Sequence, residues 1–559
     1  CLHGLSVAML ELPGALVHML SGIFEQLVKI YSAAQLSVHL LEFVSSISRE
    51  PRLYTGFHTR DYRVLFAVAI NYIRFHNNQR RRESSLMGTV SVNDAALDQY
   101  VLVMAYQVID AYYLSLSSTL KAEILDHLIV GLLQTNYSRN SLDEVNEVCL
   151  DMVLQNYNRS SEEILTTSEV AVKEEFGPVV ERSWIQHNSI VTIRAQKEGP
   201  LAQIMIRSSS GTTSRVVDLP AEVARKFTER IEQPLGSMPT SPQSELSKPT
   251  FGSLPRSISR GRSISRSRRL HSTAAPGAGS SYSEADTLPL DSIARLLRGE
   301  LVQHGNAIAR SLRIFDSTPT VDAHKVSVAY VGPGQTTERE ILLNQQGSPA
   351  YWNFLHGLGK IKRLARMEGF SAGLDTSGQD TDGRYTIGWR DLIANLVFHV
   401  GTLMPAQENR QEQIIRKKAH MGNDYVHIIF NESGRDYDLN TISSHFNFVQ
   451  IIVTPVDGLV ASHEETSSRL HGELPEQGAH EVQLYKVRTQ INPEIPFIGP
   501  AAEPKVLTLT ALPAFVRSIA IHAVIFSQVY TTCKSSETGG EAEYVSLWHA
   551  RLQIIKRIR

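Results

Sequence analysis

The sequence predicts a multidomain protein with an N-terminal all-α, HEAT-like helical region, a small antiparallel β segment and a C-terminal α/β domain whose central sheet is flanked by helices. The chain has 559 residues. An ordinary domain has about 100–200 residues, so this length predicts several domains. Along the chain, the spacing of apolar residues is first that of helices, then that of strands, and finally a mixture of both. A Ser- and Arg-rich stretch interrupts the pattern. The predicted parts are a helical region 1–160, a β-rich segment 161–235, a linker 236–284 and an α/β domain 285–559.

The composition describes a globular chain without a strong overall charge. Hydrophobic residues make up 42%, charged residues 20%, and the net charge is −2. This balance provides no general attraction to nucleic acid or to an anionic membrane. Cys1, Cys149 and Cys533 lie far apart without the spacing of metal ligands, which favours a reducing compartment over a disulfide framework. We therefore expect no nucleic-acid partner and no zinc site.

The chain begins at Cys1, within a stretch of helical character, and shows no signal peptide. We expect it to be part of a longer protein. The apolar stretch 101–116 contains Gln107 and Asp110 and is shorter than the about 20 apolar residues that a bilayer span needs. We expect no integral membrane segment.

Residues 1 to 155 show helical spacing of apolar residues almost throughout. Ile23 and Leu27 lie one turn apart, and the segments 97–116 and 118–135 form an apparent antiparallel pair joined by a Ser-rich turn. Paired amphipathic helices with short connections are typical of a HEAT-type solenoid. No clear repeat period is visible, so a plain helical bundle stays open as the alternative.

The next segment alternates apolar and polar residues. Residues 189–195, 201–207 and 214–220 have this pattern, and turn-forming residues separate them at 197–200 and 208–211. We therefore predict a three-stranded meander.

Residues 236–284 are rich in Ser, Pro, Gly and Arg and have little to bury, so they predict a solvated linker. Within it, Arg260 and Arg262 lie five and three residues before Ser265. Basophilic kinases select arginine at such positions, and a phosphate on Ser265 would change the charge of the linker. Ser265 is therefore a candidate phosphorylation site, with an unmodified tether as the alternative.

After residue 285, helical and strand-like segments alternate, which is typical of a layered α/β domain. We predict helices at 290–312, 351–367, 391–404 and 512–530, and strands at 325–332, 425–430 and 446–455, with a further strand-like stretch at 383–389.

Common catalytic motifs are missing from this domain. The stretch 328–338, VAYVGPGQTTE, has Thr337 where a dinucleotide-binding loop needs glycine, so a turn after a strand is the better interpretation. The loop 374–385, LDTSGQDTDGRY, lacks the glutamate that would complete a calcium site, and we expect a surface loop. His324, His356 and His399 occur singly and are expected to be structural.

The segment 417–430, KKAHMGNDYVHIIF, contains a turn with an unusual set of side chains. Gly422 permits a close approach or an unusual backbone angle, and Asp424 can cap the turn. The predicted strand 425–430 would give Asn423 a rigid base. These residues alone leave Asn423 open between a turn-forming role and a chemical one.

Several distinctive motifs follow one another along the second half of the chain. They are VAYVGPGQ, FLHGLGKI, AGLDTSGQDTDGRYTIGWRDLIANLVFHVGTLMP, KKAHMGNDYVHIIFNESG, TISSHFNFVQIIVTP, LPAFVRSIAIHA and WHARLQIIKRIR. In this order they resemble the catalytic domain shared by the tuberin family and the Rap GTPase-activating proteins. Residues 199–217 are similar to the small β segment that precedes the linker in tuberins, and the resemblance implies a distant family member, such as a fungal one.

In this family an asparagine is inserted into the active site of a small GTPase. The family pattern His-x-Gly-Asn-Asp matches residues 420–424, so the resemblance implies that Asn423 is the catalytic residue. His420 is expected to support it, together with Gly422 and Asp424, and Asn431 to brace the turn beyond the strand. Lys417 and Lys418 are expected either to contact the GTPase or to lie on a solvated face.

The resemblance further implies a GTPase activator that supplies a residue in trans, rather than a free-standing enzyme. Its substrate would be a Rheb-like GTPase, with a Rap-like GTPase or an inactive scaffold as alternatives. Magnesium and GTP would belong to the GTPase, so no cofactor of the chain's own is expected. The resemblance also implies a dimeric or larger tuberous sclerosis complex with hamartin-like and TBC-domain subunits. This complex would restrain TOR signalling in the cytoplasm, including at the lysosome or vacuole surface.

Overall fold

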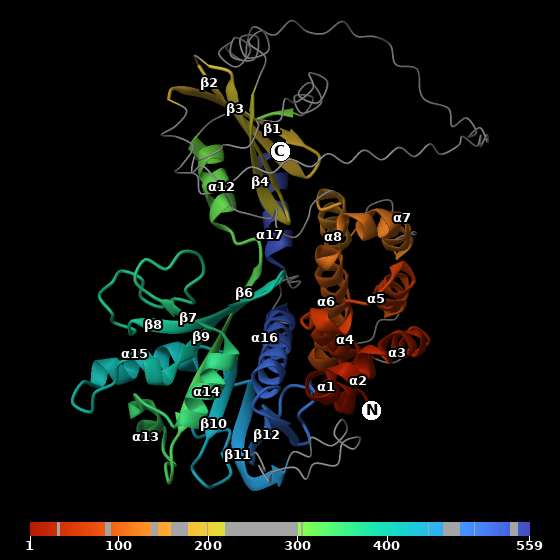
Figure 1. The fold of residues 1–559 in the computed structure, drawn as a ribbon. Helices are drawn as coiled ribbons and strands as arrows, with labels where there is room; N and C mark the ends of the chain where they lie inside the picture. The colour runs from red at the N-terminus through yellow and green to blue at the C-terminus, as the bar shows by residue number, and fades with distance from the viewer. Residues whose placement is uncertain are drawn as a thin grey trace, which may run out of the picture. The chain divides into compact units, whose positions relative to one another are not determined.

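The structure is a computed structural model (Figure 1). It divides into two compact units, Cys1–Thr166 with Arg207–Thr213 and Gln303–Arg559, and Thr167–Ile206 with Ser214–Val302. It describes residues 1–30, 34–83, 91–135, 143–157, 177–197, 199–218, 300–302, 306–444, 446–461, 481–496, 498–536 and 546–559. The predicted linker 236–284 and Ser265 lie outside these residues.

The first unit contains an eight-stranded sheet in the order β13-β12-β11-β10-β6-β9-β8-β7. Its four central strands, β11, β10, β6 and β9, run parallel, and antiparallel strands extend the sheet at both ends. The central strands are apolar on both faces, as parallel strands covered by helices usually are. The strands are β6 (Asp322–Val331), β7 (Lys360–Arg363), β8 (Tyr385–Arg390), β9 (Ala394–Val400), β10 (Val426–Asn431), β11 (Val449–Ala461), β12 (Glu481–Ile491) and β13 (Lys505–Thr508).

Helices cover both faces of this sheet (Figure 1). On one face, Val328 and Phe430 belong to the same core as Phe354 of α14 and Phe526 of α16. On the other face, Ala329 and Ile429 pack with residues of α13 and α15. The predicted α/β domain is therefore confirmed. Its helices are α12 (Asn306–Ser317), α13 (Glu338–Leu343), α14 (Pro349–Leu358), α15 (Gln411–Gly422), α16 (Leu512–Ser536) and α17 (Leu547–Ile558).

The N-terminal part is helical, as predicted, although a regular HEAT repeat stays a prediction. The longest of its helices, α5 and α6, pack against each other. The helices are α1 (Leu2–Glu11), α2 (Pro13–Val17), α3 (Leu20–Leu27), α4 (Ala34–Ser48), α5 (Thr59–Glu83), α6 (Val92–Ser115), α7 (Ser118–Thr135) and α8 (Glu144–Gln155).

These helices share a core with the α/β domain, whereas the sequence predicted two separate domains. Helix α6 packs along α16, and the Tyr100 hydroxyl donates to the His522 carbonyl at 3.3 Å. The Glu42 carboxylate accepts from the Gly499 amide at 3.1 Å, and the Ser46 and Ser518 hydroxyls lie 2.7 Å apart. Buried polar groups without partners are costly, so these matched pairs stabilise the contact.

Among the described residues, α16 is long and apolar enough to cross a membrane by length and composition alone, a feature that the sequence analysis missed. Within its apolar stretch Leu512–Ser535, 83% is buried inside the protein. Packing between the sheet and α6 accounts for this apolar surface, as expected of a core helix.

The second unit is built on an antiparallel sheet in the order β4-β3-β2-β1-β5. The sequence predicted three of its strands and missed β1, which pairs with β2 along its whole length. The strands are β1 (Val179–Gln186), β2 (Ser189–Gln196), β3 (Leu201–Ser208), β4 (Gly211–Asp218) and β5 (Glu300–Leu301).

Three predicted helices were wrong in whole or in part. The predicted helix 391–404 is strand β9, because a short run that is apolar on both sides also suits a strand buried on both faces. The predicted helix 351–367 ends at Leu358 and is followed by β7. A side chain at Gly359 would lie 2.6 Å from the Gly388 carbonyl oxygen, so this close approach to β8 requires glycine. Within the described part of the predicted helix 290–312, the chain forms strand β5 and then the start of helix α12.

Candidate functional site

Asn423 is the residue at which helix α15 ends and the chain turns toward strand β10. Its backbone angles, φ −94° and ψ 9°, lie in the bridge region, where the third residues of turns and many active-site residues are found. Its side chain is exposed, and no described residue forms a hydrogen bond with its carboxamide. A primary amide can donate through its nitrogen and accept through its oxygen. The amide donor and the amide acceptor of Asn423 are therefore both available to another molecule.

The neighbouring Asp424 is completely buried and is held by two basic side chains. One carboxylate oxygen lies 2.8 Å from His399 Nδ1, and the other lies 3.3 Å from Lys325 Nζ. His399 Nε2 lies 3.1 Å from the Ala372 carbonyl oxygen. Both ring nitrogens of His399 thus lie within hydrogen-bond distance of an oxygen atom. Asp424 is therefore a buried anchor that braces the turn from inside the protein.

The same anchor ties the turn to three adjacent strands. His399 lies on β9 and Lys325 on β6, and β6 pairs with both β9 and β10. The Asp424 carbonyl oxygen lies 3.1 Å from the Nε2 atom of His427 on β10. Asn423 therefore stands on a base that is fixed by the centre of the sheet, as a positioned functional group requires.

His420 lies in the last turn of α15 and connects this helix to the loop 374–384. Its Nε2 atom is 3.1 Å from a carboxylate oxygen of Asp382, and its ring centroid is 5.2 Å from that of His399. Burial raises the pKa of Asp382, but hydrogen bonds with His420 and with the Asp375 amide outweigh burial and lower it overall. His420 thus connects the last turn of α15 to Asp382, and its support of Asn423 stays a prediction.

The loop that supplies Asp382 is held together by its own hydrogen bonds. Asp375 accepts from the Ser377 amide at 2.9 Å and from the Thr381 hydroxyl at 2.7 Å. Gly383 has a φ of 97°, and a side chain there would meet the Leu403 carbonyl oxygen. Within the described ranges no group of three or more His, Cys, Asp or Glu side chains could hold a metal ion.

The prediction that Lys417 contacts a GTPase is wrong. The side chain is 2% exposed and donates to the carbonyl oxygens of Leu342, at 2.7 Å, and Asn344, at 3.0 Å. It therefore ties α15 to the end of α13. Lys418 is half-exposed and is paired with Glu338 at 2.9 Å, so a contact of Lys418 with a partner stays a prediction.

We expect Lys417→Met to change how stability depends on pH. Burial lowers the pKa of Lys417 to about 7 from its ordinary 10.5. Between these values the unfolded chain binds more protons than the folded chain, so the free energy of unfolding rises with pH in that window. The variant should lose this part of the rise. Urea unfolding at pH 7 and pH 9 measures it, with Lys418→Met as the exposed control. An unchanged rise in Lys417→Met would contradict the assignment.

Two further predicted residues differ in outcome. Gly422 has no left-handed backbone angle, and a side chain there would meet only Ser444 at an ordinary 3.8 Å. The expected conformational role of Gly422 is therefore not found.

Asn431 is buried and braces the following turn, as predicted. Its amide nitrogen donates to the Arg435 carbonyl at 2.7 Å, and its oxygen accepts from the Ser433 amide at 3.1 Å.

The sequence analysis missed Lys325 and Asp382 and treated His399 only as an isolated structural residue. Lys325 and His324 are the basic residues of strand β6, which also contains Asp322 and Ser327. A lysine in a central strand is the one local signal for a paired charge at this place. No local signal links these residues to the turn. Lys325 and His399 lie about 100 and 25 positions before Asp424 and meet it through the order of the strands, and Asp382 reaches the turn through His420.

Comparison with known proteins places this site in a family. A model of the Rap/ran-GAP family matches residues 341–557, which include α15 and β10, and a tuberin model matches residues 1–80. The tuberous sclerosis 2 protein homolog of Schizosaccharomyces pombe is 30% identical over all 559 residues. The chain is a tuberin-family protein with a Rap/ran-GAP domain. It spans 37% of the length of that yeast relative.

Other relatives match a shorter stretch of the chain. Subunit alpha-1 of the human Ral GTPase-activating protein is 30% identical over 223 residues, which are 40% of this chain and 10% of the relative. A solved structure of the TSC2 GAP domain is 40% identical, covers 38% of this chain and 99% of its own, and has a TM-score of 0.32. The N-terminal helices of this tuberin-family chain thus accompany a domain that also occurs in other proteins.

Proposed function

We propose that this chain is a GTPase-activating protein that inserts Asn423 into the active site of a Rheb-like small GTPase. The observation that supports it most is the exposed carboxamide of Asn423, which no described residue binds, next to the buried anchor of Asp424. Membership in a family with a Rap/ran-GAP domain supports the same reaction class.

The chemistry of a carboxamide suits this task. Small GTPases hydrolyse GTP slowly because the attacking water is poorly ordered and charge on the transferred phosphoryl group is incompletely stabilised. The Asn423 oxygen would accept a hydrogen bond from the attacking water, and its nitrogen would donate to an oxygen of the phosphate. In this reaction the GTPase would bring GTP and magnesium, and this chain would supply a positioned side chain.

Such a role depends on rigidity, because a misplaced group loses most of its effect on the rate. The buried contacts of Asp424 with His399 and Lys325 fix the backbone beside Asn423. The pair of His420 and Asp382 holds the last turn of α15 against the loop 374–384. In this proposal, His399, Lys325 and Asp382 act as positioning residues and do not touch the GTPase.

The cellular setting is also a proposal. Similarity to a tuberous sclerosis 2 homolog along the whole chain supports membership in a dimeric or larger tuberous sclerosis complex with hamartin-like and TBC-domain subunits. In that setting the activity would restrain TOR signalling from the cytoplasm, including at the surface of the lysosome or vacuole.

The test is single-turnover GTP hydrolysis by a panel of purified GTPases, namely a Rheb-like, a Rap-like and a Ral-like protein, with and without this chain. We expect the largest acceleration with the Rheb-like protein. A larger acceleration of the Rap-like or Ral-like protein would overturn the substrate assignment but keep the activity. No acceleration of any member would overturn the activity and leave a scaffold as the remaining function.

A further inference from the structure

The two edges of the eight-stranded sheet differ in how they are covered. At one edge, the Glu11 carboxylate of α1 accepts a hydrogen bond from the Thr508 amide of β13 at 2.7 Å. At the other edge, β7 pairs with β8 along one side. Within the described ranges no strand pairs with its second side. An open edge of this kind offers unpaired backbone groups to another chain.

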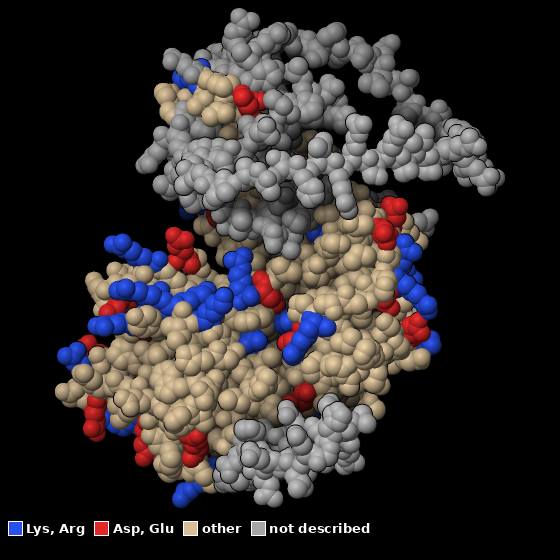
Figure 2. Space-filling view, in the orientation of Figure 1, with Lys and Arg blue, Asp and Glu red and all other residues tan. Residues whose placement is uncertain are grey.

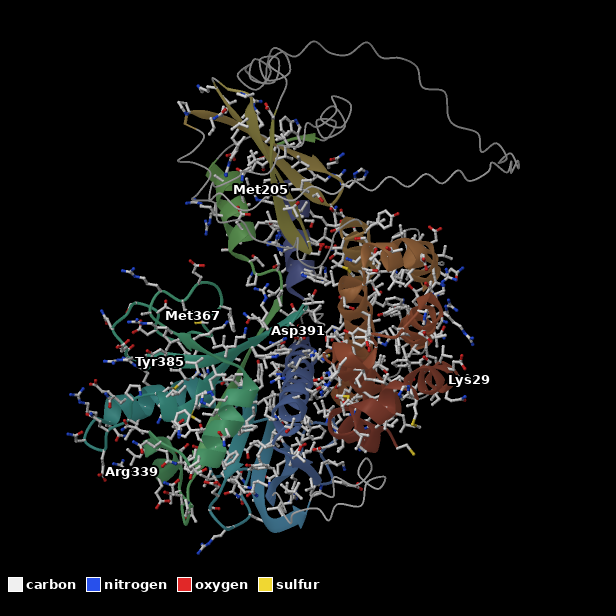
Figure 3. The ribbon with its side chains drawn as sticks, in the orientation of Figure 1. Lys29, Met205, Arg339, Met367, Tyr385 and Asp391 are labelled. Carbon is white, nitrogen blue, oxygen red and sulfur yellow. The ribbon has the colours of Figure 1, made fainter. Side chains whose placement is uncertain are left out.

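One face of β7 borders an apolar hollow. Ile361 of β7 is 54% exposed and Tyr385 of β8 is 45% exposed, and Figure 3 labels Tyr385 at this corner of the sheet. The hollow has a volume of about 240 Å³. It is lined by Trp352, Leu355, His356, Ile361, Tyr385, Ile387 and Leu403. Large apolar side chains exposed around a hollow are typical of a binding surface.

The opposite face of β7 is basic. Successive side chains of a strand point to opposite faces, so Lys360 and Lys362 lie on the face away from Ile361. Arg363 at the end of the strand is exposed. Figure 2 shows more Lys and Arg than Asp and Glu side chains over the part of the molecule where Figure 1 places β7 and β8. The edge therefore has a basic face at Lys360 and Lys362, whereas the other face is apolar at Ile361 and ends on Arg363.

Lysines on an edge strand can simply prevent aggregation. That explanation accounts for Lys360 and Lys362 but not for Ile361, which lies between them and is exposed next to the hollow. A purely protective edge would place a polar residue at this position, because an exposed β-branched residue favours pairing with another strand.

We propose that β7 binds an extended segment of a partner protein in which apolar and acidic residues alternate. Such a segment would add to the sheet as a further strand, with its backbone paired to the open edge. Its side chains would then alternate between the two faces. Apolar residues would enter the hollow beside Ile361, and acidic residues would pair with Lys360 and Lys362. This surface is separate from Asn423, and the proposal does not depend on GTPase activation.

Fluorescence anisotropy with labelled peptides and the full chain tests this proposal. The probe is an eight-residue peptide of alternating glutamate and valine. One control peptide has the same composition in the order Glu-Glu-Val-Val, repeated, and a second control replaces glutamate by lysine. We expect the alternating acidic peptide to bind at least tenfold more tightly than either control. Equal binding of the two glutamate peptides would overturn strand addition, because charge alone would then explain the affinity.

Variants of the chain locate the binding surface. Ile361→Glu and the double variant Lys360→Glu with Lys362→Glu should each weaken binding of the alternating peptide at least tenfold. The matched control is Val506→Glu, at a half-exposed valine on the covered edge strand β13. Thermal unfolding of each variant verifies the fold. Unchanged binding by both β7 variants, or equal weakening by Val506→Glu, would contradict the proposal.

Discussion

Asn423→Ala is expected to remove nearly all acceleration of GTP hydrolysis while leaving the fold intact. The substitution deletes the carboxamide that the mechanism requires, and the loss of one positioned hydrogen-bonding group in an active site typically lowers the rate about 10²–10³-fold. Stability should stay within about 0.5 kcal/mol, because Asn423 is exposed and forms no bond with any described residue. Single-turnover hydrolysis by the best GTPase of the panel measures the rate, and thermal unfolding measures the stability.

The matched control for this variant is Asn353→Ala. Asn353 is exposed on α14, which covers the opposite face of the sheet from α15. It should keep the acceleration of the unmodified chain. Binding of the GTPase in complex with a transition-state mimic separates recognition from chemistry. A normal rate in Asn423→Ala would refute the proposed role of this residue, whatever the control shows.

Asp424→Ala is expected to reduce both stability and activity. It removes the carboxylate that is the partner of both His399 and Lys325, and His399 stays buried without it. Removal of one partner of a buried ion pair typically lowers the free energy of unfolding by about 3–5 kcal/mol. The half-exposed Lys325 can turn toward water, so we expect the lower part of that range. Urea unfolding measures the loss.

Activity separates a positioning role of Asp424 from a merely structural one. At a temperature where the variant is still folded, the rate at saturating activator should fall, while the concentration that gives half of this rate should change little. Asp424→Asn keeps the shape of the side chain and should recover part of both losses. The control is Asp436→Ala, at an exposed aspartate after β10. A folded Asp424→Ala protein with the full rate would show that Asn423 is positioned without the anchor.

Most of the fold class follows from local patterns. Alternating β-forming residues identified β10, and apolar runs identified β6 and β11, because these features depend only on residues that are close in sequence. The stretch that forms β8 was predicted as strand-like. The same rule failed for β9. Its apolar run suits a helix as well as a strand that is buried on both faces, and only pairing with β6 and β8 distinguishes the two.

The candidate site divides in a similar way. Residues 420–424 are contiguous, so their pattern and the resemblance to a known family were enough to single out Asn423. Lys417 lies just three positions before His420, yet its role was wrongly predicted. Successive residues of a helix point in directions about 100° apart, so Lys418 is half-exposed while Lys417 faces the end of α13. The sequence does not show which side of the helix is covered.

The sequence by itself determined the class of the protein, the position of its turn and the side chain that stands there. The tertiary structure decided what holds that side chain in place. His399 and Lys325 reach Asp424 because β9, β6 and β10 are neighbours in the sheet, and the order of strands depends on pairing between distant segments. It also decided that the N-terminal helices share a core with the α/β domain, since burial of α16 depends on surfaces that meet only in the folded chain.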